Sequence, residues 1–275
     1  MPEKNNSVLL GFEVKSLLGI LSKIITHPLE LILSRKRALK YPFTASNGKT
    51  YSGTILGITQ QLADEGFLNM RGLIVNCLSV IPVQAILNPL RDPVKSFFKN
   101  VFIIEKDSSF FKRFLYILLS GSTMGALSIT MFYGLHRYLA VSGLPPECVT
   151  EPSTIYDLYS GFGLSVLGMM LYRGLYVGIY DIVKPHKFTG FWGKFTSGFA
   201  VTTLTGLILY PLGKIALTQM VHCCTASKAI SIIHDHPDGL WEGYMGGCKE
   251  NIFRGLLGTM VSISFDYLKG WLKSE

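Results

Sequence analysis

Long apolar stretches alternate with shorter polar segments along the whole chain. Three of the stretches contain no charged residue over a length that crosses the hydrocarbon core of a membrane as a helix, which takes about 20 residues. Three others contain charges, and charged side chains at membrane depth are costly unless they face a polar interior. The uncharged stretches are residues 72–90, 114–135 and 195–213, and the charged ones are residues 10–33, 158–184 and 246–271. The pattern predicts six membrane-spanning helices, of which the three charged ones line a cavity.

Short patterns recur in the three parts into which breaker residues divide the chain, and each part reads as span, polar segment and span. The parts are residues 1–106, 107–187 and 188–275. An aromatic-Asp-x-x-Lys pattern closes the second and third parts, at Tyr180–Lys184 and Phe265–Lys269, and Asp92–Lys95 repeats its charged half in the first. His27-Pro28-Leu29, Tyr133-Gly134-Leu135 and Tyr210-Pro211-Leu212 recur at intervals of roughly a hundred residues. This period indicates a threefold membrane repeat.

The polar segments differ among the three parts. In the first part, Ile55, Ile58 and Leu62 lie at helical spacing and predict a short amphipathic helix. The last part repeats this scheme with Ala229, Ile230 and Ile233 and a stop at Asp238-Gly239. The middle segment contains Pro145-Pro146 and Pro152, so it is too short and too rich in proline for such a helix.

Composition and charge agree with a membrane protein. Of the 275 residues, 48% are hydrophobic and 16% are charged, and the mean hydropathy of +0.35 is too high for a soluble domain. The net charge of +8 has two interpretations, attraction to anionic lipid or to an anionic substrate inside the protein. No basic stripe with stacking aromatic residues indicates binding to nucleic acid. The five cysteines lack C-x-x-C spacing, so free thiols are expected.

Taken with these features, the chain resembles the mitochondrial carrier family, and within it the ADP/ATP carriers, over nearly its whole length. The resemblance rests on Pro28-Leu29-Glu30, on the aromatic-Asp-x-x-Lys copies, and on stretches such as Asp64–Leu68, Pro82–Ala85, Leu171–Gly174 and Asn251–Gly255. It implies an all-α membrane protein of the mitochondrial inner membrane, with six transmembrane helices in three pseudo-threefold repeats and short matrix-side helices. It also implies a substrate site at the midplane between two gates of salt bridges. The first fifteen residues contain no arginine, so targeting is expected to be internal.

The resemblance implies a set of substrate contacts for an anionic nucleotide, which needs fixed cations and a stacking surface. The matching residues are Lys23, Tyr172, Arg173 and Arg254 as cationic or aromatic contacts, and Gly168 and Met169 as the pair that receives an adenine. Ser79 stands where the ADP/ATP carriers have an arginine, and Ala216-Leu217-Thr218 replaces an Arg-Arg-Arg run, so much of the phosphate-binding charge is absent. Pairing of the three retained cations with acids or carbonyls in the interior is an equally open interpretation.

The two gates implied by the resemblance are preserved to different extents. The matrix gate of the family uses Pro-x-[Asp/Glu]-x-x-[Lys/Arg] in each repeat, and here only Pro28, Glu30 and Pro211 remain of it. Arg35, Lys36 and Arg37 follow at the wrong spacing and are expected to form a lipid-facing or solvated basic cluster. The cytoplasmic gate retains all three acid and base pairs, Asp92/Lys95, Asp181/Lys184 and Asp266/Lys269. Because alternating access requires two closures of comparable stability, this asymmetry predicts impaired transport.

Three triplets resemble the cardiolipin sites of the family, where helix N-termini meet phosphate, although an ordinary turn also explains each one. They are Tyr51-Ser52-Gly53, Tyr159-Ser160-Gly161 and Trp241-Glu242-Gly243. Bound cardiolipin is therefore expected, and no other cofactor.

Other chemistry has weaker support. His222-Cys223-Cys224 with His234 and His236 contains the ligand types of a transition-metal site, but the adjacent cysteines favour an ordinary polar connector, and no metal is predicted. No glycine-rich phosphate loop, Ser/His/Asp set or pair of carboxylates indicates an enzyme.

Two functional hypotheses remain. The favoured one is a degenerate carrier-fold protein, impaired in transport, that serves as a structural subunit among other proteins of a larger inner-membrane assembly such as a respiratory complex. The alternative is a functional but divergent ADP/ATP-type nucleotide antiporter. The lopsided retention of gate charges is the reason for the preference.

Overall fold

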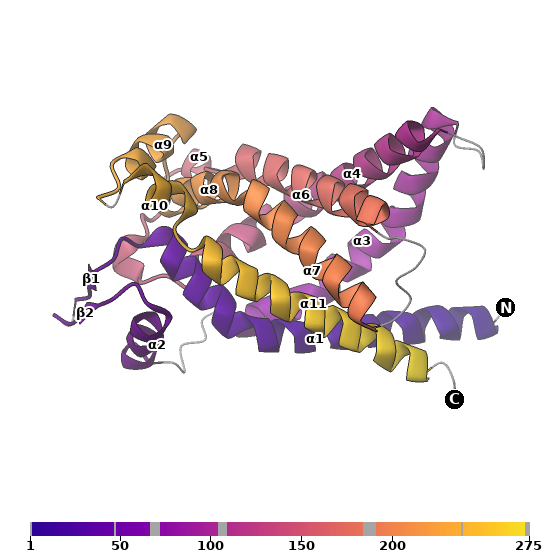
Figure 1. The fold of residues 1–275 in the computed structure, drawn as a ribbon, viewed down its shortest axis with the longest axis horizontal. Helices are drawn as coiled ribbons and strands as arrows, with labels where there is room; N and C mark the ends of the chain where they lie inside the picture. The colour runs from indigo at the N-terminus through magenta and orange to yellow at the C-terminus, as the bar shows by residue number, and fades with distance from the viewer. Residues whose placement is uncertain are drawn as a thin grey trace.

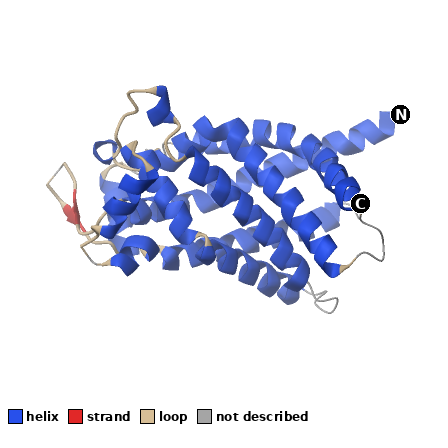
Figure 2. Ribbon diagram, turned by 90° about the horizontal axis from the view of Figure 1, so that it is seen from above, coloured by secondary structure: helices blue, strands red, loops and turns tan. Residues whose placement is uncertain are grey.

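The computed structural model describes residues 2–46, 48–66, 72–103, 109–183, 191–237 and 239–272, and nearly all of them are helical (Figures 1 and 2). The long helices are α1 (Pro2–Ala38), α3 (Leu73–Phe102), α4 (Phe110–Val141), α6 (Phe162–Val183), α7 (Phe191–Ile208), α8 (Tyr210–His222) and α11 (Cys248–Leu272). The shorter elements are strands β1 (Phe43–Thr44) and β2 (Thr50–Tyr51), helices α2 (Ile55–Asp64), α5 (Ile155–Leu158), α9 (Ala226–His234) and α10 (Leu240–Met245), and the 3-10 turn η1 (Pro146–Cys148). This is the all-α carrier fold that the sequence predicts.

The long helices form a closed ring. Contacts run from α1 to α3, from α3 to α4, from α4 to α6, from α6 to α7, from α7 to α11, and from α11 back to α1. By length and apolar composition, α3 and α4 can each cross a membrane, and α7 with α8 makes a third span that bends by 56° after Ile208. The six predicted spans therefore correspond to α1, α3, α4, α6, the bent pair α7–α8, and α11.

Two helices run further than the spans predicted from the sequence. Helix α3 continues from residue 90 to Phe102 with Pro82, Pro89 and Pro93 inside it. Membrane helices tolerate proline because neighbouring helices and local adjustments satisfy the freed backbone groups. Helix α1 continues past residue 33 to Ala38, and it ends shortly before the Tyr41-Pro42 step. The extra turn of α1 places Arg35 and Arg37 inside the ring rather than in a connector.

Glycines let α4 and α6 approach closely. A Cβ atom on Gly125 would lie 2.6 Å from the carbonyl oxygen of Met169, and one on Gly121 would lie 3.1 Å from that of Arg173. Small residues give membrane helices this kind of backbone contact. In the same way, a Cβ on Gly19 of α1 would lie 2.6 Å from Val80 of α3.

The short elements gather at one end of the ring, which we call the connector end (Figure 1). Strands β1 and β2 pair antiparallel there, with Phe43 opposite Tyr51. Helix α2 is capped by Thr54, whose side chain accepts a hydrogen bond from the Gly57 amide, and its Ile58 and Leu62 pack in an apolar cluster with α1. This helix confirms the amphipathic prediction.

The other two connectors also follow the predicted pattern. Helix α9 begins after the cap Thr225 and buries Ala229 and Ile233. It ends at His234, earlier than the predicted stop at Asp238-Gly239, of which Asp238 lies outside the described residues. In the middle segment, η1 and α5 take three and four residues, so the proline-rich connector forms no extended amphipathic helix, as predicted.

Candidate functional site

Two adjoining cavities occupy the middle of the ring. The inner cavity, of about 500 Å³, lies towards the connector end and takes residues from all six spans. The outer cavity, of about 770 Å³, takes residues from α3, α4, α6, α7 and α11. Met169 and Tyr172 of α6 line both, so the two form one continuous region. Volumes in this range match those of small-molecule sites in proteins.

Basic side chains dominate the charged part of the cavity walls. Among the described residues, the basic side chains are Lys23, Arg37 and Arg254 in the inner cavity and Arg91, Lys95 and Arg173 in the outer one. The described acidic lining residue is Glu30, in the inner cavity. In a low-dielectric interior each fixed charge acts more strongly than in water. The arrangement attracts an anion with several negative charges.

The substrate contacts predicted from the sequence lie together. Lys23, Gly168, Met169, Tyr172 and Arg254 line the inner cavity, and Arg173 lines the outer one. Their proximity follows from the ring, which brings α1, α6 and α11 around one space. Their roles in binding stay predictions.

Two further residues of this region were not predicted. Tyr176 lines the outer cavity, and its ring stacks on that of Tyr172 with centroids 6.1 Å apart and planes at 22°. Arg91 precedes the gate motif on α3 and lies one helical turn from Lys95, on the same face. The spacing of four residues between Arg91 and Lys95 is the sequence signal that could have found it.

Glu30, predicted as a remnant of the matrix gate, has partners on its own helix and on α3. Its carboxylate lies 3.5 Å from Lys23 Nζ, and both side chains are partly exposed to the cavity. Thr26 Oγ1 and Asn76 Nδ2 each donate to it at 3.4 Å. Lys23, a candidate substrate contact, is therefore paired with an acid. Such pairing was the other interpretation that the sequence left open for this lysine. Pro28 lies within the same helix and Pro211 in the first turn of α8.

Arg137 joins α4 to α8 at the connector end. Its side chain is 4% exposed and donates to the carbonyl oxygens of Asp157, Leu158 (2.8 Å) and Met220 (3.1 Å), and to the sulfur of Cys223 at 3.0 Å. Met220 belongs to α8, so one guanidinium holds three segments together. Hydrogen bonds from charged groups are stronger than those between neutral groups.

Arg35 and Arg37 make the corresponding connections from α1. Arg35 Nε donates to the carbonyl of Gly143 at 3.0 Å, beyond the end of α4, and its two terminal nitrogens bind the Glu65 carboxylate at 2.9 and 2.6 Å. The Arg37 guanidinium lies 4.5 Å from the ring centre of Tyr210 in α8. The predicted lipid-facing or solvated basic cluster at Arg35, Lys36 and Arg37 is therefore wrong for the two arginines, because α1 continues and turns them into the ring. Arg35 is only 5% exposed.

These contacts close a layer across the connector end of the ring, which we call the arginine layer. It consists of Arg35 between α1 and the end of α4, Arg137 between α4 and α8, and Arg37 between α8 and α1. The predicted loss of acid and base pairs from this gate does not leave the end open. Carbonyl oxygens and an aromatic ring replace the carboxylates as partners.

The opposite end of the ring lacks such a layer among the described side chains. Asp92 and Lys95 of α3 are exposed and form no ion pair with a described residue, and Lys95 lines the outer cavity. Asp181 lies on α6, and Asp266 and Lys269 lie on α11. Lys184 lies outside the described residues. The cytoplasmic gate stays a prediction.

The three predicted lipid triplets occupy different surroundings at the connector end. Tyr51 is buried and donates to Asp64 at 2.9 Å, and Gly53 precedes α2. Hydrogen bonds from Lys49 and then Tyr51 hold the pKa of the Asp64 carboxyl below its usual value. Tyr159 and Gly161 precede α6, with the Tyr159 ring half-exposed. Trp241 and Gly243 lie in α10, and Trp241 is largely exposed.

The histidines and cysteines considered as weak metal ligands lie in separate environments. Cys223 accepts from Arg137, His234 packs edge-on to Tyr244, and His222 and His236 line a further cavity. All five cysteines are free thiols in the structure.

Comparison with known proteins gives one consistent group of relatives. No family model matches the chain. The ADP,ATP carrier protein of Neurospora crassa is 30% identical over 254 residues, covering 80% of this chain and 79% of the relative. ADP/ATP translocase 4 of Bos taurus is 29% identical over 252 residues, covering 82% and 77%. The ADP,ATP carrier protein of Kluyveromyces lactis is 27% identical over 307 residues, covering 97% and 96%.

Proposed function

Because the chain belongs to the mitochondrial carrier family, with ADP/ATP carriers as its relatives, we propose that it moves an adenine nucleotide or a similar polyvalent organic anion across the inner membrane. The observation that carries this proposal is the charge of the central cavities. Six basic side chains, Lys23, Arg37, Arg91, Lys95, Arg173 and Arg254, face one acid, Glu30, among the described lining residues.

The cavity also offers a surface for a flat ring beside these charges. Tyr172 and Tyr176 stack along α6, and Gly168 and Met169 lie one turn earlier on the same helix. A base can lie against such a surface while phosphates reach the basic residues, since aromatic stacking and charge-assisted hydrogen bonds act on different parts of a nucleotide. This combination favours a nucleotide over inorganic phosphate.

The arginine layer supports a working gate at the end where this chain lacks the salt bridges that the family resemblance implies. A transporter needs a closure at each end that opens in turn. Arg35, Arg37 and Arg137 provide a closure at the connector end, which corresponds by resemblance to the matrix side. Impaired transport was predicted because such a closure was expected to be missing.

A structural subunit of a larger inner-membrane assembly remains the second candidate, and the same layer gives it one observation in favour. Arg137 is buried with four acceptors, and opening the ring there would leave a charged group without partners. Stranding a buried charge costs several kcal/mol, about 3–5 by analogy with broken buried ion pairs. A layer too stable to open would keep the fold and abolish exchange.

Exchange by the purified full-length protein in liposomes decides between the two. We expect uptake of labelled ADP against internal ATP, and loss of at least about tenfold in rate for Arg254→Ala, because one charge-assisted contact in a cavity contributes about 1.5–3 kcal/mol. Lys228→Ala is the matched control, since Lys228 is exposed on α9 and away from the central cavities. Exchange that is absent in the wild type, with stoichiometric comigration of the native protein with a respiratory complex, would favour the structural role.

We also propose that cardiolipin binds at the connector end, where α2 and α6 begin just after the triplets at Tyr51 and Tyr159 and the triplet at Trp241 lies in the first turn of α10. Helix N-termini favour phosphate groups. Native mass spectrometry of the purified protein tests this proposal. Retention of cardiolipin after delipidation is expected, and equal retention of phosphatidylcholine would contradict a specific site.

A further inference from the structure

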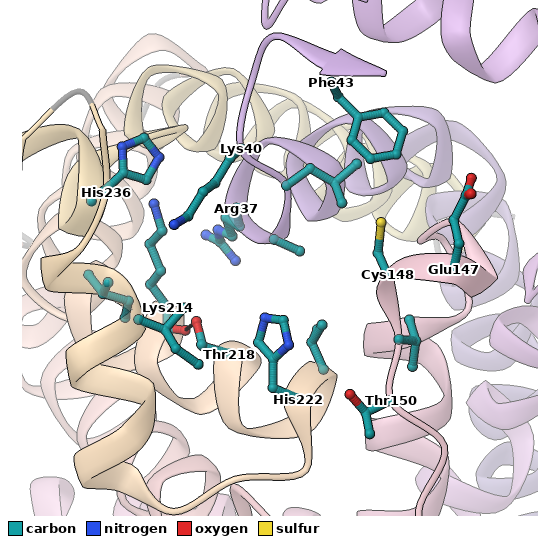
Figure 3. A pocket seen from close by; sticks show the side chains of 17 residues that line it. Arg37, Lys40, Phe43, Glu147, Cys148, Thr150, Lys214, Thr218, His222 and His236 are labelled. Atoms are coloured by element: carbon teal, nitrogen blue, oxygen red, sulfur yellow. Dashed lines mark hydrogen bonds between the residues drawn. The ribbon is translucent and has the colours of Figure 1, made fainter. Parts of the chain in front are cut away.

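A third cavity, of about 660 Å³, lies at the connector end, and we call it the connector cavity (Figure 3). Its walls come from the end of α1, from β1, from η1 and the residues after it, from α8, and from α9 and the residues that follow it. Helix α8 lies between it and the inner cavity, and Arg37 lines both. One face of α8, with Gly213, Leu217 and Met220, lines the inner cavity, and another, with Lys214 and His222, lines the connector cavity.

Basic groups gather on one side of this cavity. Arg37 comes from α1, Lys40 from the segment just after it and Lys214 from α8, and the imidazoles of His222 and His236 complete the group, whereas Glu147 lies on the opposite wall (Figure 3). Glu147 is the acidic residue among the described lining residues. The cavity therefore has an excess of positive charge.

The hydrogen-bond partners of these cations do not neutralise them. Lys40 Nζ donates to the carbonyl of Asp235 at 3.4 Å, and Lys214 Nζ to the carbonyl of Glu242 at 3.1 Å. Arg37 donates to the side-chain oxygen of Asn251 at 3.2 Å. Lys214 is only 6% exposed and forms no salt bridge with a described residue, although the Glu242 carboxylate attracts it from outside this cavity. Buried charges in proteins are normally paired with an opposite charge. An anion in the cavity would supply that charge.

We propose that the connector cavity binds an organic anion that carries a phosphate group. Lysine ammonium groups bind phosphate as point charges, and arginine adds directed donors. The rest of the wall is apolar, with Phe43, Val149 and Ile233, and it suits the organic part of such a ligand. The volume lies within the range of small-molecule sites. Arg37 also lines the inner cavity, but Lys40, Lys214, His222 and His236 do not line the central cavities, so the inference does not depend on the proposed transport function.

Cys148 gives a local readout, because its thiol lines the cavity on the wall opposite the basic groups (Figure 3). Burial raises the pKa of this thiol, so alkylation is best followed at about pH 8, where a larger fraction is thiolate. The experiment measures the rate at which N-ethylmaleimide modifies Cys148 in the purified full-length protein, by mass spectrometry of its peptide. Cys77 of α3 is the internal reference, since it lines none of the three cavities.

The probes are inorganic pyrophosphate, ATP, and vesicles of phosphatidylcholine with or without cardiolipin. We expect pyrophosphate and ATP to slow modification of Cys148 and not of Cys77. The concentration for half-protection should rise about fivefold in Lys40→Gln, the effect of removing one exposed charge contact, and stay unchanged in Lys112→Gln, because Lys112 is exposed on α4 and lines none of the three cavities. Protection should persist in Arg254→Ala, because Arg254 lines the inner cavity and not the connector cavity.

Comparing the probes in this experiment shows whether the phosphate group belongs to a soluble ligand or to a lipid headgroup. Protection by pyrophosphate and ATP supports a soluble ligand, and protection by cardiolipin vesicles alone, weakened by Lys40→Gln, supports the site with a lipid headgroup as its occupant. Absence of protection by every probe would overturn the proposal. Protection that disappears in Arg254→Ala, or that is equal in Lys40→Gln and the wild type, would also overturn it, because the effect would then come from another site.

Discussion

Replacing Arg137 by methionine tests the arginine layer directly. Methionine has a similar length but no donor, so the change removes all four hydrogen bonds that join α4, α8 and the α5 connector. A hydrogen bond from a charged group contributes about 1.5–3 kcal/mol, but removal of the arginine also removes the cost of burying its charge. We expect a net destabilisation of about 3 kcal/mol, within the range of broken buried networks.

Thermal unfolding in a fixed detergent and at a fixed scan rate measures this effect. For a chain of this size, 1 kcal/mol corresponds to about 2–4 °C in Tm, so Arg137→Met should lower Tm by about 6–12 °C. Lys112→Met on the same helix is the control, because Lys112 is exposed. Equal Tm values for the two variants would refute the view that Arg137 holds the connector end together.

Two further predictions concern packing and pH. Gly125→Ala should destabilise the protein by about 1–3 kcal/mol, because its methyl group would overlap a carbonyl oxygen of α6, whereas Gly134→Ala, with open space around it, should be nearly neutral in the same unfolding assay. The Asp64 carboxyl has a lowered pKa, so its bonds to Lys49 and Tyr51 stabilise the fold above the ordinary carboxyl range and are lost as pH falls through the folded-state value. The Tm difference between wild type and Asp64→Asn should therefore be present at pH 7 and shrink progressively as the pH falls below about 4, and a difference that is constant with pH would contradict this assignment.

The sequence predicted the features that depend on local pattern. Apolar residues at helical spacing predicted α2 and α9, because this spacing places them on one face of a helix. Ile58 of α2 and Ala229 of α9 lie on these faces and are buried. The uncharged stretches gave α3, α4 and the bent pair α7–α8, and the prolines after residue 144 gave the short middle connector. Resemblance to a family then brought together the substrate-contact candidates of α1, α6 and α11.

The closure of the connector end could not be predicted in this way. Arg137 binds backbone carbonyls, and a carbonyl is present at every residue, so its partners leave no trace in the sequence. Arg35 binds Glu65, but the pair is only brought together once α1 is known to reach Ala38. The missing acids and bases of the gate motif predicted an open connector end, whereas other donors and acceptors close it in the structure.

The contact between α1 and α11 has a consequence for biogenesis. Since the first and last long helices pack side by side and Arg37 donates to Asn251, the circle of spans is completed only when the C-terminal helix has been inserted into the bilayer. Until then Lys23 and Glu30 have one flank facing lipid instead of protein, an arrangement that hydrocarbon penalises. Nascent chains that stop before α11 should consequently be poor at leaving their insertion chaperones and prone to degradation, even though most of their residues have already been made.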